Sequence, residues 1–205
     1  MIKKLLLSFL LGTALLCQAE ADNPPLKHHQ IRLGWGDPLF ETLAFHEGVS
    51  QNDDFTRMDR FGYTGHIFLE YQYRFTKAIS VGLQTDFQGI FWNETPCDAF
   101  RNPISPAVRS RNYDLSILPT LRFTCLNTRY VQLYGGLGAG LLIAFDNARQ
   151  CELAPVVNLT LLGVQIGKGP WSGSLELGGM TAVRNANTVY MLGSRLVSVS
   201  VNYSW

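Results

Sequence analysis

Apolar and polar residues alternate with a period of two along most of this chain, and this restricts the possible folds more than any other feature. In HIFLEYQYRF, the odd-numbered positions from Ile67 to Phe75 are apolar or aromatic, whereas the even-numbered positions include Glu70 and Arg74. A helix repeats every 3.6 residues, whereas a strand with two different faces repeats every two. The sequence therefore predicts an all-β protein whose strands separate an apolar face from a polar one.

Eight segments show this alternation, and seven of them place the apolar set on odd-numbered positions. The exception is 154–168, where Val157 and Leu161 are odd-numbered but Val164 and Ile166 are even-numbered. A bulge between these two pairs would reset the phase. The predicted strands span residues 28–36, 64–75, 78–92, 111–124, 129–144, 154–168, 171–180 and 189–205.

The connections between these segments alternate in length. Three of them are tight turns, at 76–77, 126–128 and 169–170. Long loops at one end and short turns at the other are typical of an antiparallel up-and-down barrel of the outer-membrane type. We therefore predict an eight-stranded transmembrane β-barrel. Its longer connections are 36–63, 93–110, 146–153 and 181–188.

Alternation alone does not say which face points outward, because a soluble eight-stranded barrel turns its apolar set inward. Aromatic residues on the odd-numbered face decide this question, since they gather at the strand ends. Such girdles, about a bilayer's depth apart, are typical of membrane interfaces. The apolar face is therefore predicted to contact outer-membrane lipid. The girdle residues are Tyr73, Phe75, Phe123, Trp171, Tyr203 and Trp205 beside the short turns, and Trp35, Phe91 and Tyr113 near the long loops.

Charged residues occupy the even-numbered face, which this assignment turns toward the lumen. Three arginines and four carboxylates nearly balance, and buried opposite charges must pair to be tolerated. We expect a filled interior, because side chains occupy the inside of a small barrel. A gated or narrow pore is the alternative. The predicted lumen network comprises Arg32, Glu70, Arg74, Asp86, Asp114, Arg122 and Glu176.

The first 21 residues have the features of a secretory signal peptide. Two lysines precede an apolar run from Leu5 to Leu16, and a small-x-small cleavage site ends at Ala21. The run is shorter than the roughly 20 apolar residues of a transmembrane helix. A lipoprotein signal would use Cys17, but bulky Leu16 precedes it. Export to the outer membrane is expected, with a signal peptide at 1–21, a linker at 22–27 and the barrel at 28–205.

The segment VSVSVNYSW, Val197–Trp205, continues the alternation to an aromatic last residue. It resembles the assembly signal of outer-membrane barrels, which implies the barrel-assembly machinery as a partner. As a pattern over 28–205, the chain resembles the small eight-stranded outer-membrane barrels of the OmpA, OmpX and OmpW type, and its YGGLGAGL and SLELGG are similar to repeats of that group. It departs from full-length OmpA in lacking a periplasmic domain after the barrel. The resemblance implies a monomer embedded in outer-membrane lipid.

Three cysteines follow the predicted signal peptide. Cys97 and Cys151 fall in long loops that emerge at the same rim, whereas Cys125 lies beside a short turn at the opposite end. Cys125 is therefore out of reach of the other two. A Cys97–Cys151 disulfide is predicted, and two free loop thiols are the alternative.

The first long loop contains DPLFETLAFHE, which begins at Asp37. Asp37 can cap a helix and Pro38 suits its first position, so a short amphipathic helix is predicted there. No metal-ligand spacing or cofactor motif is visible in the sequence. A net charge of +1, with 16 % charged residues, gives no footprint of nucleic-acid binding.

The leading hypothesis for function is a non-enzymatic outer-membrane barrel with a structural or surface-interaction role, exercised through its long loops. A porin-like narrow conduit for small or hydrophobic solutes is the first alternative. The second is a lipid-modifying enzyme with a site at the outer rim. Such a site would pair His66 with Asp53, Asp54 or Ser110.

Overall fold

The computed structural model describes residues 26–36, 56–98, 100, 102–145, 151–185, 188–190 and 197–205. Within these residues the chain forms ten strands and no helix. The strands are β1 (His29–Gly36), β2 (Thr56–Tyr63), β3 (His66–Arg74), β4 (Ile79–Pro96), β5 (Val108–Asn127), β6 (Val131–Phe145), β7 (Cys151–Ile166), β8 (Trp171–Asn185), β9 (Thr188–Tyr190) and β10 (Val197–Ser204).

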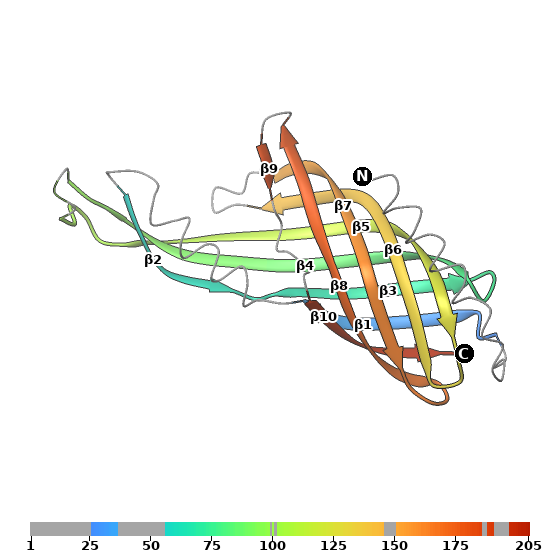
Figure 1. Ribbon diagram of the computed structural model, residues 1–205. Coiled ribbons are helices and arrows are strands. Elements are labelled where there is room, and N and C mark those ends of the chain that lie inside the picture. The colour runs from blue at the N-terminus through green and yellow to red at the C-terminus, as the bar shows by residue number, and fades with distance from the viewer. Residues whose placement is uncertain are drawn as a thin grey trace, which may run out of the picture.

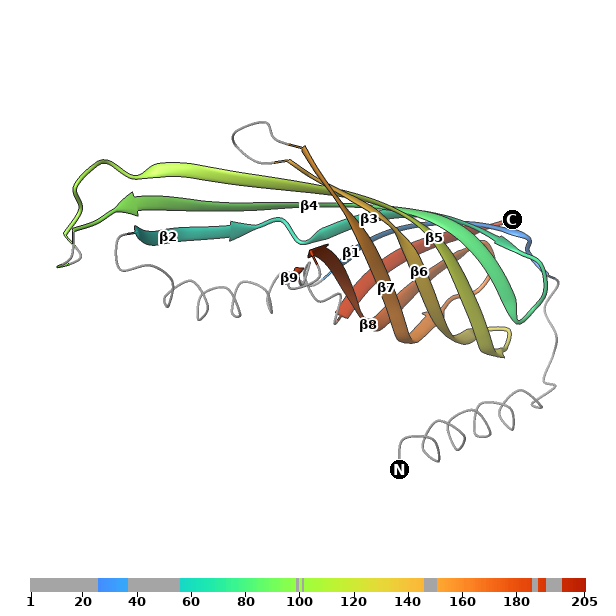
Figure 2. The same cartoon turned by 90° about the horizontal axis from the view of Figure 1, so that it is seen from above.

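Eight of these strands close into an antiparallel barrel, as Figure 1 and Figure 2 show. Their order is β1–β3–β4–β5–β6–β7–β8–β10, and β10 pairs with both β8 and β1. The two remaining strands extend this sheet, since β2 pairs with β4 and β9 pairs with β8. The predicted all-β, eight-stranded antiparallel barrel is confirmed.

The register of the strands is staggered around the barrel. The backbone N–H of Ser204 donates to the carbonyl oxygen of Pro170, the residue just before β8. Starting again from Ser204, the directly paired residues can be followed from strand to strand in the other direction around the barrel. They lead back to β8 at Met180, ten positions after Pro170 (180 minus 170). A stagger of this kind requires the strands to tilt against the barrel axis. The path runs from Ser204 through Gln30, Gln72, Gly82, Thr120, Gly138 and Asn158 to Met180.

Except beyond the bulge in β7, even-numbered side chains of the barrel strands point into the barrel and odd-numbered ones point outward, as the alternation predicts. In β1 the exposed fraction is 1 % for Arg32 but 57 % for its neighbour Leu33. The same alternation runs through β3 and β10. The barrel is therefore polar inside and apolar outside, the reverse of a water-soluble core.

The sixth predicted strand, which corresponds to β7, contains a bulge. The register of β7 with β8 shifts between Thr160 and Leu162, so the consecutive residues Leu161 and Leu162 are both exposed. Beyond this point Gln165 points inward and Ile166 outward. The predicted bulge is confirmed, and it keeps the apolar side chains of this strand on the outer face.

One part of the interior is apolar. Buried side chains from β5, β6, β7 and β8 pack together there, on one side of the lumen. They add an ordinary hydrophobic contact to an otherwise polar interior. The cluster consists of Leu118, Leu142, Ala154, Val156, Met180 and Ala182.

Several expectations fall outside the described residues. These are the signal peptide at 1–21, residues 22–25 of the linker and the helix predicted to begin at Asp37. Among the described residues, no helix is long and apolar enough to cross a membrane.

Candidate functional site: the central charge cluster and the projecting hairpin

Four charged side chains meet in the middle of the barrel, and we call them the central cluster: Arg32, Glu70, Arg122 and Glu176. Arg32 lies between the two carboxylates, with Nη1 2.5 Å from Glu70 Oε2 and Nη2 2.7 Å from Glu176 Oε1. Arg122 Nη2 lies 3.3 Å from Glu70 and 3.5 Å from Glu176. All four side chains are buried, and two positive charges face two negative ones. The cluster therefore neutralises itself within the chain, as buried charges must.

Neutral side chains complete the hydrogen bonds of the central cluster. The Tyr134 hydroxyl donates to Glu176 Oε1 at 2.8 Å, and the Arg122 guanidinium lies 4.0 Å from the centre of the Tyr134 ring. Thr120 donates to Glu70 at 2.8 Å, and Arg32 Nε donates to Asn202 Oδ1 at 2.9 Å. A buried network with this many partners fixes its side chains in one arrangement.

Two glycines leave the space that large interior side chains need. A Cβ atom on Gly163 would lie 2.1 Å from the Tyr134 ring, and one on Gly34 would lie 2.2 Å from the Phe68 ring. Neither aromatic side chain was predicted as part of the interior network. The available signal was their even-numbered position, because an aromatic residue on the polar face of a strand must fit among interior side chains.

The barrel is filled at the level of the central cluster. A cavity of about 20 Å³ borders Arg32, Glu70 and Arg122. This volume holds about one water molecule. Arg122 Nη1 and Gln72 Oε1, both of which are buried, have no hydrogen-bond partner within the described chain. Both residues line the cavity, which has room for a water molecule but not for a solute.

Only four of the seven residues predicted to form the lumen network interact with one another, and these are the residues of the central cluster. Asp86 accepts a hydrogen bond from Gln84 and lies 3.3 Å from His66 Nδ1, and Asp114 accepts one from Gln88 at 2.6 Å. Both carboxylates lie farther toward the long-loop end than the central cluster. The staggered register separates the seven residues along the barrel axis, although all of them point inward.

Arg74, the seventh predicted member, lies at the short-turn end of β3. Its guanidinium donates to two neutral amide oxygens, Gln30 Oε1 at 3.2 Å and Gln132 Oε1 at 3.3 Å. Within the part of the chain that the structure describes, no carboxylate forms an ion pair with it. The expectation that Arg74 pairs with a lumen carboxylate is therefore wrong.

The strands β4 and β5 continue beyond the barrel as a hairpin, which Figure 1 and Figure 2 show reaching past the ends of β6 and β7. The pairing of β5 with β6 ends at Tyr113 and Phe145, whereas its pairing with β4 continues to Val108. On the other edge of β4, β2 pairs as far as Thr56. We call residues 90–112, together with β2, the projecting hairpin. The sequence predicts loops over most of this region.

Asp98 binds two backbone N–H groups at the tip of the projecting hairpin. Asp98 Oδ1 accepts the backbone N–H groups of Phe100 and Asn102, at 2.9 and 2.8 Å. Hydrogen bonds from the backbone and side chain of Asn102, and from the Phe100 backbone, hold the pKa of Asp98 below its usual range. Asp98 therefore remains ionised, and keeps accepting these bonds, at neutral pH.

Apolar side chains and one strand edge of the projecting hairpin are exposed. Phe100 is 86 % and Ile104 is 68 % accessible. Residues 108–112 of β5 pair with β4 on one side only, as far as the described chain extends. An unpaired edge of this kind can receive an extended segment of another chain.

The predicted Cys97–Cys151 disulfide is not formed. Cys97 is buried at the tip of the projecting hairpin, whereas Cys151 is an exposed thiol at the start of β7. Through Phe145 and Tyr113, Cys151 is level with Gly89. Cys97 lies eight positions farther along the chain (97 minus 89), which is about 26 Å at the rise of a strand. A disulfide needs Cα atoms about 4.4–6.8 Å apart. The prediction is wrong because it treats the extended hairpin as a short loop.

The predicted girdle residues lie on the outer face in two groups. Beside the short turns, the ring centres of Trp171 and Tyr203 are 4.9 Å apart, and those of Tyr203 and Trp205 are 5.7 Å apart. The same end of the barrel carries Tyr73, Phe75 and Phe123. Near the long loops, Phe91 lies 5.7 Å from Tyr113, and Trp35 Nε1 donates to the Thr64 carbonyl oxygen at 2.9 Å.

The structure does not assemble the residues of a rim enzyme within its described part. Ile67 pairs with Phe87, so His66 is level with Gln88, whereas Ser110 pairs with Trp92. These levels are four positions apart along β4 (92 minus 88), which is about 13 Å at the rise of a strand. Asp53 and Asp54 lie outside the described residues. Metal-binding groups of three or more His, Cys, Asp or Glu are likewise absent from the residues with described placement.

No model of a known protein family matches the sequence, and no curated protein matches it.

Proposed function

We propose that this protein is an integral outer-membrane barrel that uses its projecting hairpin to bind partners at the cell surface. The observation that carries this proposal is the inverted barrel, apolar outside and polar inside, with one hairpin that extends beyond it. The resemblance to small outer-membrane barrels agrees with this reading.

The outer face of the barrel supports a lipid environment. Side chains such as Leu69, Leu83 and Leu141 are about half exposed there, at 51, 50 and 55 %. They belong to a belt that extends over the outward positions of all the barrel strands, far larger than the few hundred Å² of a typical exposed apolar patch. In water such a belt would drive aggregation, whereas in a bilayer it is matched by lipid chains.

The spacing of the aromatic girdles agrees with the thickness of an outer membrane. On β5, Tyr113 belongs to the outer group and Phe123 to the inner group, ten positions apart (123 minus 113). This separation is about 33 Å along a strand, or about 25 Å of height at the usual strand tilt. The apolar band of an outer-membrane barrel is about 25 Å tall.

The projecting hairpin supports a role in binding rather than transport. The central cluster fills the middle of the lumen and leaves a cavity for about one water molecule there, which argues against a conduit. By contrast, the hairpin presents a hydrogen-bonded tip, an exposed Phe100 and an unpaired β5 edge. Segments that protrude from a rigid scaffold commonly carry function.

The lipid part of the proposal is tested by two matched substitutions. Leu83 and Val108 have similar exposed fractions, 50 and 59 %, but only Leu83 lies in the apolar belt. In lipid vesicles, Leu83→Arg is expected to lower the free energy of unfolding by about 2–4 kcal/mol. Val108→Arg should change it by less than about 0.5 kcal/mol. Urea unfolding of both refolded variants measures this, and equal effects would show that the belt does not face lipid.

The binding part is tested by shortening the projecting hairpin. Replacement of residues 92–110 by Asn-Gly joins Phe91 to Arg111 through a two-residue turn, which suits a β-hairpin. We expect a folded barrel, shown by heat-modifiable mobility in electrophoresis, that no longer promotes adherence or aggregation of expressing cells. A second variant, Phe100→Ser, keeps the hairpin and removes one 86 % exposed aromatic ring, which separates the contribution of this side chain from that of the hairpin as a whole. If the shortened protein promotes adherence as the wild type does, or the wild type conducts ions in planar bilayers without promoting adherence, the binding role is wrong.

A further inference from the structure

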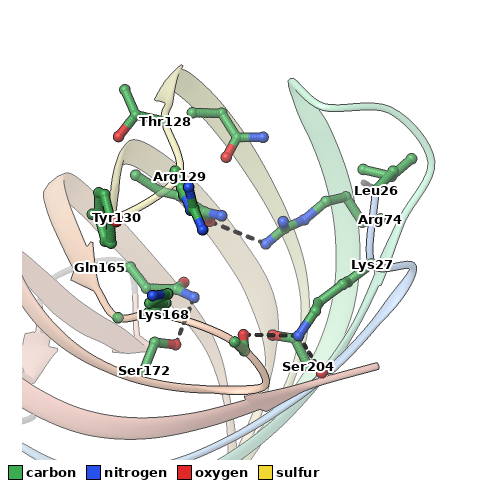
Figure 3. A pocket seen from close by; sticks show the side chains of 14 residues that line it. Leu26, Lys27, Arg74, Thr128, Arg129, Tyr130, Gln165, Lys168, Ser172 and Ser204 are labelled. Atoms are coloured by element: carbon green, nitrogen blue, oxygen red, sulfur yellow. Dashed lines mark hydrogen bonds between the residues drawn. The ribbon is translucent and has the colours of Figure 1, made fainter. Parts of the chain in front are cut away.

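A cavity of about 340 Å³ opens at the short-turn end of the barrel, and we call it the inner mouth. Four of its lining residues carry a positive charge: Lys27, Arg74, Arg129 and Lys168. None of its lining residues is Asp or Glu. Figure 3 shows Arg74 and Lys27 on one side of the opening and Arg129 and Lys168 on the other. The inner mouth is therefore a concave surface with positive charge on opposing sides.

Arg74 makes the inner mouth more than a group of surface cations. This residue is only 7 % exposed, and its two hydrogen bonds, to Gln30 and Gln132, both use Nη2. Within the described chain, Nε and Nη1 have no hydrogen-bond partner, so the planar fork still has donors to offer. A buried guanidinium without a counter-charge is costly. An anion in the cavity would supply the missing charge and accept these donors.

The other groups of the inner mouth fit the same ligand. The Lys27 ammonium donates to the carbonyl oxygens of Gly169 and Ser204, at 2.8 and 3.1 Å, so it is held in place at the opening. Arg129 and Lys168 are exposed at the rim and can approach a bound group. Gln165 donates to the Ser172 hydroxyl oxygen at 2.8 Å, which leaves the Ser172 O–H free to donate to a ligand.

We propose that the inner mouth binds a compact oxyanion with more than one negative charge, such as a phosphate group. Arg74 would contact it bidentately, because a guanidinium matches two oxygens of one phosphate. The volume of the inner mouth lies near the lower end of ligand pockets, which favours a small group over an extended one. The phosphate can belong to a soluble molecule or to an anionic phospholipid headgroup beside the short turns. The proposal does not depend on the projecting hairpin.

The direct test uses pyrophosphate as the probe. The purified protein, refolded in a non-ionic detergent, is titrated with pyrophosphate in a calorimeter at low chloride concentration. Arg74→Gln is expected to weaken binding by at least about tenfold, since it removes a charge-assisted contact in a buried site. Lys168→Gln should weaken it by about two- to fivefold, because the side chain is exposed. Arg109→Gln removes the same charge from the projecting hairpin and should leave the affinity within about twofold.

A second arm identifies the source of the phosphate. In nanodiscs, pyrophosphate binding is compared between phosphatidylcholine alone and a mixture with phosphatidylglycerol. Weaker binding in the mixture would show that a lipid headgroup occupies the inner mouth, and equal binding would show a site for soluble anions. Either result supports an oxyanion site.

Two outcomes would overturn the proposal. One is a wild-type protein that does not bind pyrophosphate, and the other is an Arg74→Gln variant that binds it as tightly as the wild type does. Heat-modifiable mobility checks that Arg74→Gln is folded. If it is not, the double variant Arg129→Gln/Lys168→Gln, which alters only exposed side chains, replaces it in the same titration. Unchanged affinity in that variant would then refute the site.

Discussion

The central cluster holds two buried arginines and the inner mouth holds one, Arg74, and the two regions differ in how this positive charge is neutralised. In the central cluster, Arg32 and Arg122 face Glu70 and Glu176, so the charges cancel within the chain. In the inner mouth, the Arg74 guanidinium donates to two amide oxygens, forms no ion pair among the described residues, and borders a cavity of about 340 Å³. At the central cluster, by comparison, the cavity is about 20 Å³.

This difference separates a structural charge network from a binding surface. A network that contains its own counter-charges and leaves room for about one water molecule gains little from a ligand. A buried cation beside an open cavity gains a counter-charge when an anion binds. The position of an arginine on the inward face is therefore a poor guide to its role, and the charge of its neighbours is a better one.

The largest expected effect comes from unbalancing the central cluster. Glu70→Gln would leave two buried guanidinium groups facing one carboxylate, so we expect the free energy of unfolding to fall by about 3–5 kcal/mol. Arg74→Gln removes a charge that has no counter-charge among the described residues, so we expect a change of less than about 1 kcal/mol, in either direction. Urea unfolding of both variants, refolded in the same detergent, measures the contrast.

The proposed difference between the two regions is wrong if these two substitutions lower the free energy of unfolding by the same amount. A loss of several kcal/mol in Arg74→Gln would mean that Arg74 supports the fold as the central cluster does. A small loss in Glu70→Gln would mean that water reaches the cluster and screens its charges, as happens for surface ion pairs.

The alternation of residue types was sufficient to predict the barrel. A period of two fixes which face each side chain occupies, and even the phase change before Val164 was readable as a bulge. Contacts across the lumen could not be predicted from the alternation. They depend on the stagger of the strands, which sets the level of each inward residue along the barrel axis. The sequence placed Arg74 and Glu70 on one face but did not show that only Glu70 is level with Arg32.

The projecting hairpin was missed for a related reason. Segments such as TRMDRFGY and NETP carry little of the alternation that marks a half-buried strand. Their strand structure depends on pairing with one another. The disulfide prediction failed with it, since an extended strand carries Cys97 far from the rim where Cys151 lies.

A smaller difference in the free energy of unfolding is expected between substitutions of Tyr134, beside the central cluster, and Tyr130, at the inner mouth. Tyr134→Phe removes the hydroxyl that donates to Glu176 at 2.8 Å but keeps the ring beside Arg122, so we expect a loss of about 1–3 kcal/mol in the free energy of unfolding. Tyr130→Phe makes the same chemical change at the inner mouth, where the side chain is exposed, and should cost less than about 0.5 kcal/mol. Parallel urea unfolding curves of the two refolded variants give the difference directly.

If the two losses are equal, the hydroxyl of Tyr134 is as well solvated as that of Tyr130, and the central cluster is open to water rather than filled. A loss confined to Tyr134→Phe would place the barrier to solutes at the level of the central cluster, between the inner mouth and the long-loop end.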